Sequence, residues 1–453
     1  MAIRLIGIFI FFSTVGFGQV STVSPFSSQG IGDVNFYGDP YFIGMGGVTA
    51  PIADSTQANM FNPASYSFLS QGLPVFSLGI AHEETEFRLN EQTSRDRFSN
   101  LTHMSLIIPF ANRLGLAFGL QPLSRSGYEV NSFQIIGGDS IFYDYSGRGE
   151  LQKFNLGFSV LLAKSLNHKL SIGANGFRYF GRLERESRAF QNQPQGNQSG
   201  AFERSFLQAR DFGFDAGFIY KFTPSSSHSL TLGASYDMQQ DVGFRRSRVR
   251  VQFNDFNFTN SYDTIQPLNV HEGSITLPQK LEVGFAYEYK TQRDTTRMRQ
   301  RRRSSSFVIS GQYSIEDWGS YTESFPTMND LPSASFFNAQ SARFGMQYRP
   351  HRYVDRSNFV NFFQRVSYRL GAYYVETPYQ NQGEQMTDVG ATFGIGIPLV
   401  ISGALSTVNL SVAAGQRGVL DRSDLLHERY LGINFGVNIT PSYDRWFMKR
   451  EIN

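Results

Sequence analysis

The stretch DFGFDAGFIYKF, residues 211–222, alternates apolar side chains with small or acidic ones. One face carries Phe212, Phe214, Ala216, Phe218, Tyr220 and Phe222, and the other carries Asp211, Gly213, Asp215 and Gly217. A period of two residues indicates a β-strand whose two faces meet different surroundings. The stretch therefore predicts a strand with one strongly apolar, aromatic face.

The same alternation recurs along the chain. Further runs occupy residues 230–238, 281–289, 389–397 and 431–439. Their polar faces hold mainly Gly, Ser, Asn and isolated acids, and aromatic residues lie near many run ends. A soluble β-sandwich could also alternate, but long runs, this polar face and the aromatic ends are typical of tilted transmembrane strands. The pattern favours a membrane barrel.

The number of runs predicts the architecture. The segments are residues 73–88, 100–110, 113–128, 148–163, 168–186, 203–222, 228–248, 278–290, 306–317, 336–349, 364–378, 384–398, 406–417 and 427–440. Short connections (111–112, 164–167, 223–227, 399–405) alternate with longer ones (129–147, 187–202, 249–277, 318–335). Bacterial barrels have short periplasmic turns and longer external loops. We predict an all-β, 14-stranded antiparallel transmembrane barrel with both chain ends in the periplasm.

The start of the chain resembles a targeting signal. Arg4 precedes an apolar run that begins at Leu5 and ends in small residues at Gly16 and Gly18. This order predicts a signal peptide over residues 1–18. Together with the barrel it predicts the outer membrane of a Gram-negative cell, surrounded by outer-membrane lipid.

Composition excludes several classes of function. The chain has no cysteine, so disulfides, thiol chemistry and lipidation at cysteine are excluded. The net charge of +3 gives no argument for nucleic-acid binding. The seven histidines lack metal-ligand spacing, and neither a hydrolase serine motif nor a phosphate-binding loop occurs. We expect no enzyme activity, no cofactor and no metal.

Residues 19–72 lack the alternation that dominates residues 73–453. Within them ANMFNPASYSFL, residues 58–69, is apolar but contains an Asn-Pro pair, which favours a turn. A barrel of fourteen strands is too wide for its own side chains to fill, because about eight strands already leave only enough room for them. We therefore expect this segment to lie inside the lumen as a plug.

Four short elements of this segment resemble the N-terminal hatch of the FadL family of outer-membrane transporters for hydrophobic compounds. They are Ser27-Ser28 with Gly30, then Gly44-Met45-Gly46-Gly47, Ile52-Ala53-Asp54 and Asn62-Pro63-Ala64. The resemblance implies a hatch over residues 19–72, with a hatch turn at the last element and hatch glycines at Gly44, Gly46 and Gly47. It also implies a hydrophobic ligand that leaves sideways through the barrel wall.

In the family the exit lies at a kink in the third strand. The third segment here contains Gln121-Pro122, and proline cannot donate to a sheet ladder. The pair predicts a lateral opening, unless Pro122 only ends the membrane part of the strand. Apolar hatch residues Phe42, Met45, Met60 and Phe61 could line the ligand's path or could simply pack the plug.

Two functions follow. The first is passive transport of hydrophobic small molecules such as long-chain fatty acids, with hatch gating and lateral exit. The second is a FadL-like barrel that transports nothing and serves in a protein secretion or outer-membrane assembly complex, similar to the type nine system. An arginine-rich turn, residues 291–305, could dock other envelope proteins in the periplasm or could be only a solvated turn. Its candidate docking residues are Arg297, Arg299, Arg301, Arg302 and Arg303.

Overall fold

The computed structural model describes residues 22–34, 38–70, 73–110, 113–192, 198–253, 262–291, 305–326, 334–350, 363, 365–401, 404–422 and 424–440. The predicted signal peptide and the five candidate docking arginines lie outside these residues, so both remain predictions.

One continuous antiparallel sheet dominates the described chain. Its strands are β1 (Val75–Leu89), β2 (Gln92–Phe110), β3 (Leu114–Ile136), β4 (Asp139–Lys164), β5 (His168–Asn192), β6 (Gln198–Ala209), β7 (Asp211–Phe222), β8 (His228–Asp237), β9 (Gln240–Phe253), β10 (Tyr262–Leu277), β11 (Lys280–Lys290), β12 (Ser306–Glu316), β13 (Thr322–Ser324), β14 (Ala339–Arg349), β15 (Ser367–Asn381), β16 (Glu384–Ile401), β17 (Ala404–Gly418) and β18 (His427–Ile439). The short helices are η1 (Pro25–Ser28), α2 (Pro40–Ile43), η2 (Pro63–Phe68) and η3 (Trp318–Ser320). None of the helices in the described ranges is long and apolar enough to span a membrane.

The eighteen strands make fourteen barrel strands. β6 and β7 both pair with β5, so they are two parts of one strand with a break between them. In the same way, β8 and β9 are two parts of one barrel strand, and so are β10 and β11, and β12 and β13. β1 pairs with β18 from Phe76↔Ile439 to Arg88↔His427, which closes the barrel. The predicted fold class is confirmed.

The alternation has the predicted orientation. On β7, Phe212, Phe214 and Phe218 are exposed on the outside of the barrel, whereas Asp215 faces inward and is buried. Apolar residues on β8 and β11 follow the same rule. The outer surface is therefore the apolar face that a lipid bilayer would cover.

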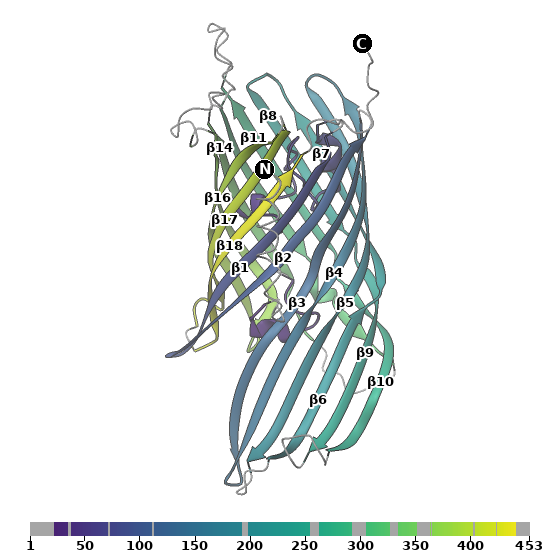
Figure 1. Cartoon of the computed structure of the whole chain (residues 1–453), viewed down its shortest axis with the longest axis vertical. Coiled ribbons are helices and arrows are strands. Elements are labelled where there is room, and N and C mark those ends of the chain that lie inside the picture. Colours follow the sequence, from purple (N-terminus) through teal and green to yellow (C-terminus); the bar gives the residue numbers. More distant parts are fainter. Residues whose placement is uncertain are drawn as a thin grey trace, which may run out of the picture.

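The prediction of long external loops was wrong in part. Most of residues 129–147 and 249–277 continue β3, β4, β9 and β10 rather than forming irregular loops. Together with β5 and β6, these strands extend beyond the rest of the barrel and form a curved sheet on one side of it. Figure 1 shows this sheet at the bottom of the view. We call this sheet the external wall, because bacterial barrels carry their long elements on the external side.

The N-terminal segment, residues 22–70 as far as described, lies inside the barrel (purple in Figure 1). Its residues form buried clusters with the inner face of the strands. One cluster joins Phe42 and Met45 to Ala286 of β11, and another joins Met60 to Ile107 and Ala117 of β2 and β3. The lumen is thus packed by the chain's own N-terminal residues.

Candidate functional site

The turn at Asn62-Pro63-Ala64, which was predicted as a hatch turn, fixes the N-terminal segment to the barrel wall. The Oδ1 of Asn62 accepts a hydrogen bond from Ala64 N (3.1 Å) and caps η2. The Nδ2 of Asn62 donates to the carbonyl oxygens of Ala50 (2.7 Å), Phe218 (3.2 Å) and Ala234 (3.2 Å). One side chain therefore links the turn, another part of the segment, and strands β7 and β8.

Inward-facing glycines of the strands let the segment approach. A Cβ on Gly233 would lie 2.1 Å from the carbonyl oxygen of Ala50, and one on Gly371 would lie 2.0 Å from Gly46 N. Gly46 itself has a φ of +68° and donates to Thr392 Oγ1 (3.0 Å). The small residues of the polar face thus provide room for the plug.

The structure also gives the positions of the remaining glycines predicted for the hatch and of the four apolar residues predicted for the path. Gly47 has a φ of +80°, and a Cβ on Gly44 would lie 3.0 Å from Gly394 Cα. Phe42 and Met45 are fully buried, so they pack the plug rather than line an open path. Met60 and the partly exposed Phe61 do border a cavity.

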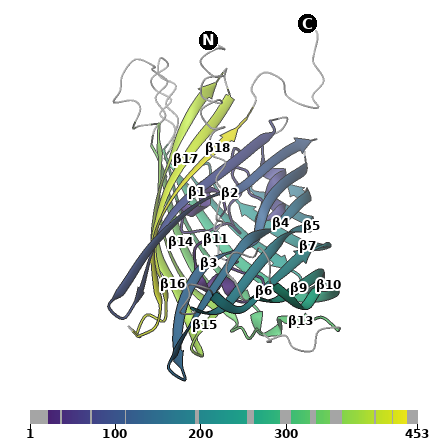
Figure 2. The ribbon, with the colours of Figure 1, turned by 60° about the horizontal axis from the view of Figure 1, so that its bottom comes forward.

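The wall of the barrel is interrupted beside Pro122. β2 and β3 pair from Phe110↔Leu114 to Met104↔Leu120, and no pair follows. β3 nevertheless continues to Ile136 against β4, with a register shift between Pro122 and Ser124. β2 continues in the β1–β2 hairpin, and the views in Figures 1 and 2 both show the hairpin parting from β3.

The N-terminal segment occupies the edge that β2 leaves. Asp33 N donates to Arg125 O (2.6 Å), and Arg125 N donates to Asp33 O (2.9 Å), which forms an antiparallel bridge. Ser124 Oγ donates to Ile31 O (2.6 Å), and Gly127 N donates to Ser27 Oγ (3.0 Å). We call residues 27–33 the edge segment.

A charged cluster holds the edge segment from the other side. Arg417 of β17 donates through Nη1 to Asp33 Oδ2 (3.0 Å) and lies within 3.6 Å of Asp388 and Glu428 carboxylates. The Nη2 of Arg125 also donates across the interruption to Leu101 O of β2 (3.0 Å). Asp33 is therefore bound by its backbone to β3 and by its carboxylate to β17, and the strands β18, β1 and β2 lie between these two.

Gly32 is needed for the edge segment to reach β3. Its φ is +95°, and an added Cβ would lie 2.3 Å from the carbonyl oxygen of Arg125. We expect Gly32→Ala to break the bridge, because strain of about 1–2 kcal/mol adds to the collision. The amide of Arg125 should then exchange its hydrogen at least tenfold faster, which corresponds to about 1.4 kcal/mol.

The matched control is Gly138→Ala. Gly138 has a φ of +97° but nothing within 4 Å of an added Cβ, so it carries the strain without the collision. Unchanged exchange of the Arg125 amide in Gly32→Ala would contradict the assignment of this bridge as a stable contact.

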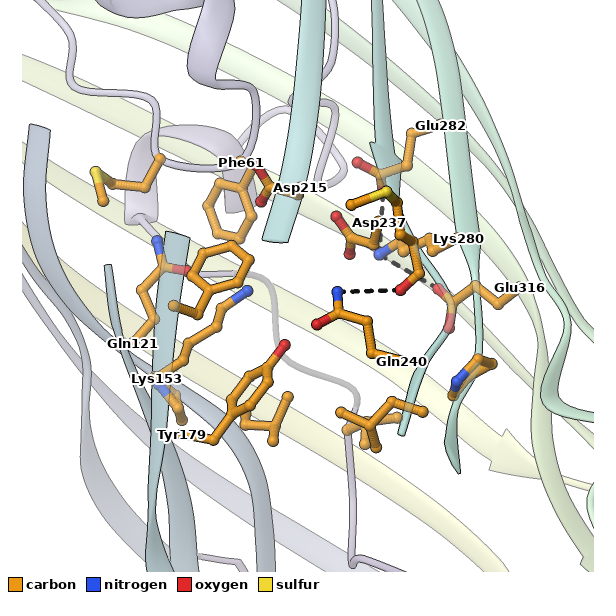
Figure 3. A pocket seen from close by; sticks show the side chains of 18 of the residues that line it. Phe61, Gln121, Lys153, Tyr179, Asp215, Asp237, Gln240, Lys280, Glu282 and Glu316 are labelled. Atoms are coloured by element: carbon orange, nitrogen blue, oxygen red, sulfur yellow. Dashed lines mark hydrogen bonds and ion pairs between the residues drawn. The ribbon is translucent and has the colours of Figure 1, made fainter. Parts of the chain in front are cut away.

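A cavity of about 190 Å³ lies behind the interruption. Gln121, Pro122, Met60 and Phe61 all border it, so the structure brings together the predicted opening and part of the predicted apolar path. Figure 3 shows Phe61, Gln121 and Lys153 on one side of the cavity and a charged group on the other.

The charged group is largely paired. Lys280 Nζ lies 3.0 Å from Glu282 Oε1 and 3.2 Å from Glu316 Oε1. Asp215 accepts from Asn175 Nδ2 (2.8 Å), and Lys153 Nζ lies 4.5 Å from the ring centre of Phe177. The charged side chains that line the cavity are Asp215, Asp237, Glu282, Glu316, Lys153, Lys280 and Arg343. Four acids and three cations thus line the cavity as a whole.

Sequence reasoning did not single out Asp33 of the edge segment or the charged groups. Ser27 and Gly30 belonged to the hatch resemblance, but nothing local indicated that Asp33 would bridge to Arg125. Within the described residues, no group of three or more His, Cys, Asp or Glu side chains could hold a metal ion.

Comparison with solved structures identifies the fold. The toluene transporter TbuX of Ralstonia pickettii superposes with a TM-score of 0.53 at 13% identity, over 89% of this chain and 98% of that one. The toluene transporter TodX of Pseudomonas putida gives 0.52 at 15%, over 90% and 98%. A FadL homologue of Pseudomonas aeruginosa gives 0.53 at 13%, over 95% and 100%. The chain therefore has the FadL-like outer-membrane barrel fold.

A search of curated protein sequences finds no match. The model of the BamG family matches residues 1–453, the whole chain. The protein is therefore a member of the BamG family.

Proposed function

We propose that the protein is a passive outer-membrane conduit for small hydrophobic compounds, which leave the lumen sideways between β2 and β3. The observation that carries this proposal is the loss of β2–β3 pairing after Leu120, directly beside a cavity that Pro122 borders. Lateral exit would deliver an apolar compound into the bilayer without its crossing the rest of the packed lumen.

The volume of the cavity favours small compounds over fatty acids. A volume of about 150 Å³ is enough to hold benzene, so the cavity of about 190 Å³ has room for one small ring and not for an extended acyl chain. The two toluene transporters have this fold, which supports the choice of toluene as the first probe.

The edge segment would be the gate. It bridges to β3 beside the interruption, and we expect passage to require the contacts of Asp33 to break. Because those contacts are hydrogen bonds and ion pairs at one short segment, a local displacement would open the wall without unfolding the rest of the plug.

Uptake by cells tests this function. We expect cells that express the protein to take up labelled toluene several times faster than cells with an empty vector, since the lipopolysaccharide layer slows apolar solutes. Labelled hexadecanoate should show no such increase. Equal toluene uptake in both strains would exclude the proposed conduit.

A second candidate is favoured by the external wall. Phe133 and Ile135 near the tip of β3, and Ile265, Leu268 and Val270 on β10, are more than half exposed although these strands extend beyond the barrel. Exposed apolar residues away from the bilayer are typical of protein-binding surfaces. A role as a non-transporting subunit of an envelope assembly complex predicts stoichiometric partner proteins after gentle purification from the native membrane, and their loss when these residues are changed to serine.

A further inference from the structure

Lysines oppose one another on the rim where the barrel chain begins and ends. Lys164 of β4 is directly opposite Lys169 of β5, and Lys169 is directly opposite Lys221 of β7. Directly opposed residues in antiparallel strands have their side chains on the same face, and like charges there are destabilising. The barrel therefore keeps an unfavourable arrangement at this rim, which we assign to the periplasmic side because it lies opposite the external wall.

The lysines face a pocket. Lys169, Lys221 and Lys290 border a pocket of about 280 Å³ between the strand ends and the N-terminal segment, to which Asp54 and Phe68 contribute. The pocket is thus reached from the lumen side of the wall and not from its lipid-facing side.

The carboxylates of the pocket already form ion pairs with cations other than Lys169 and Lys221. Asp54 is ion-paired with Arg349, and Glu288 lies 3.0 Å from Lys290 Nζ. Among the described residues, neither Lys169 nor Lys221 forms an ion pair. Four cations and two acids line the pocket, which leaves an excess of positive charge.

We propose that this pocket binds an acidic segment of a periplasmic protein, with carboxylates between Lys169 and Lys221. One observation favours a peptide over a lipid headgroup: residues of the N-terminal segment border the pocket, which puts it on the luminal face of the wall. An anion between the two lysines would remove the repulsion that the register imposes. The proposal goes beyond transport and does not depend on it.

Binding of a labelled acidic peptide tests the proposal. The probe is fluorescein-labelled hexaglutamate, and its anisotropy is followed with the full-length protein in detergent at low salt. We expect Lys169→Gln with Lys221→Gln to weaken binding by roughly tenfold. The control is Arg113→Gln, since Arg113 is exposed at the β2–β3 turn on the same rim and is absent from the pocket lining. It should change binding less than twofold.

A second measurement separates binding from folding. The double glutamine variant should unfold at the same temperature as the wild type or at a higher one, because it removes like-charge repulsion. A lower unfolding temperature would mean that the lysines stabilise the barrel and would overturn the proposal. So would equal peptide binding by wild type and double variant, no binding by the wild type, or displacement by glycerol 3-phosphate as strong as by unlabelled hexaglutamate, which would indicate a lipid headgroup.

Discussion

A disulfide between positions 33 and 125 is expected to stop the uptake of toluene through the protein, and reduction of the disulfide is expected to restore this uptake. Asp33 and Arg125 exchange both backbone hydrogen bonds, and residues paired in this way have Cα atoms about 5.5 Å apart. A disulfide needs a Cα separation of about 4.4–6.8 Å. The chain has no native cysteine, so Asp33→Cys with Arg125→Cys can form only this one intramolecular bond.

The oxidised variant should fall to the uptake rate of cells with an empty vector, because the edge segment can no longer leave β3. The reduced variant should take up labelled toluene faster than the wild type, since Asp33→Cys also removes the ion pair with Arg417. The two single cysteine variants, treated with the same oxidant, are the controls. An oxidised double variant as active as the reduced one would exclude the edge segment as the gate.

Asn62→Ala should release the plug and convert a silent barrel into an ion-conducting one. The change removes the η2 cap, which is worth about 1 kcal/mol, and the donor that reaches Ala50, Phe218 and Ala234. With buried acceptors left unsatisfied, the total loss is on the order of 2–4 kcal/mol. Conductance across a planar lipid bilayer measures the result, because water and ions enter a lumen that the plug no longer fills.

Two variants identify which contact matters. Asn62→Ser keeps a side-chain acceptor for the cap but cannot reach the wall, so it should conduct almost as well as Asn62→Ala. Asn59→Ala removes the hydrogen bonds to Thr49 O and Ile52 O (both 2.9 Å), which lie within the N-terminal segment, and should conduct much less. If Asn62→Ala remains as silent as the wild type, the contact of Asn62 with the wall does not hold the plug.

The prediction for residues 58–69 shows that a local pattern can predict a turn but not the distant residues that the turn contacts. An Asn-Pro pair in an apolar stretch predicted a buried turn, and the structure has a capped helical turn there because Asn62 and Pro63 satisfy local rules for a helix start. The sequence could not identify the carbonyl oxygens of β7 and β8 as partners of Asn62, since they lie more than 150 residues away.

The sequence by itself determined the strand pattern, the outward aromatic face, the barrel of fourteen strands and the proline in the third strand. Each of these depends on period-two alternation or on the missing N–H of one residue, which are local properties. Only the tertiary structure decided that 129–147 and 249–277 extend the sheet, that β2 leaves β3 after Leu120, that Asp33 takes its place and that Lys169 opposes Lys221. These features depend on register and on the pairing of distant segments, and many pairings share the same alternation.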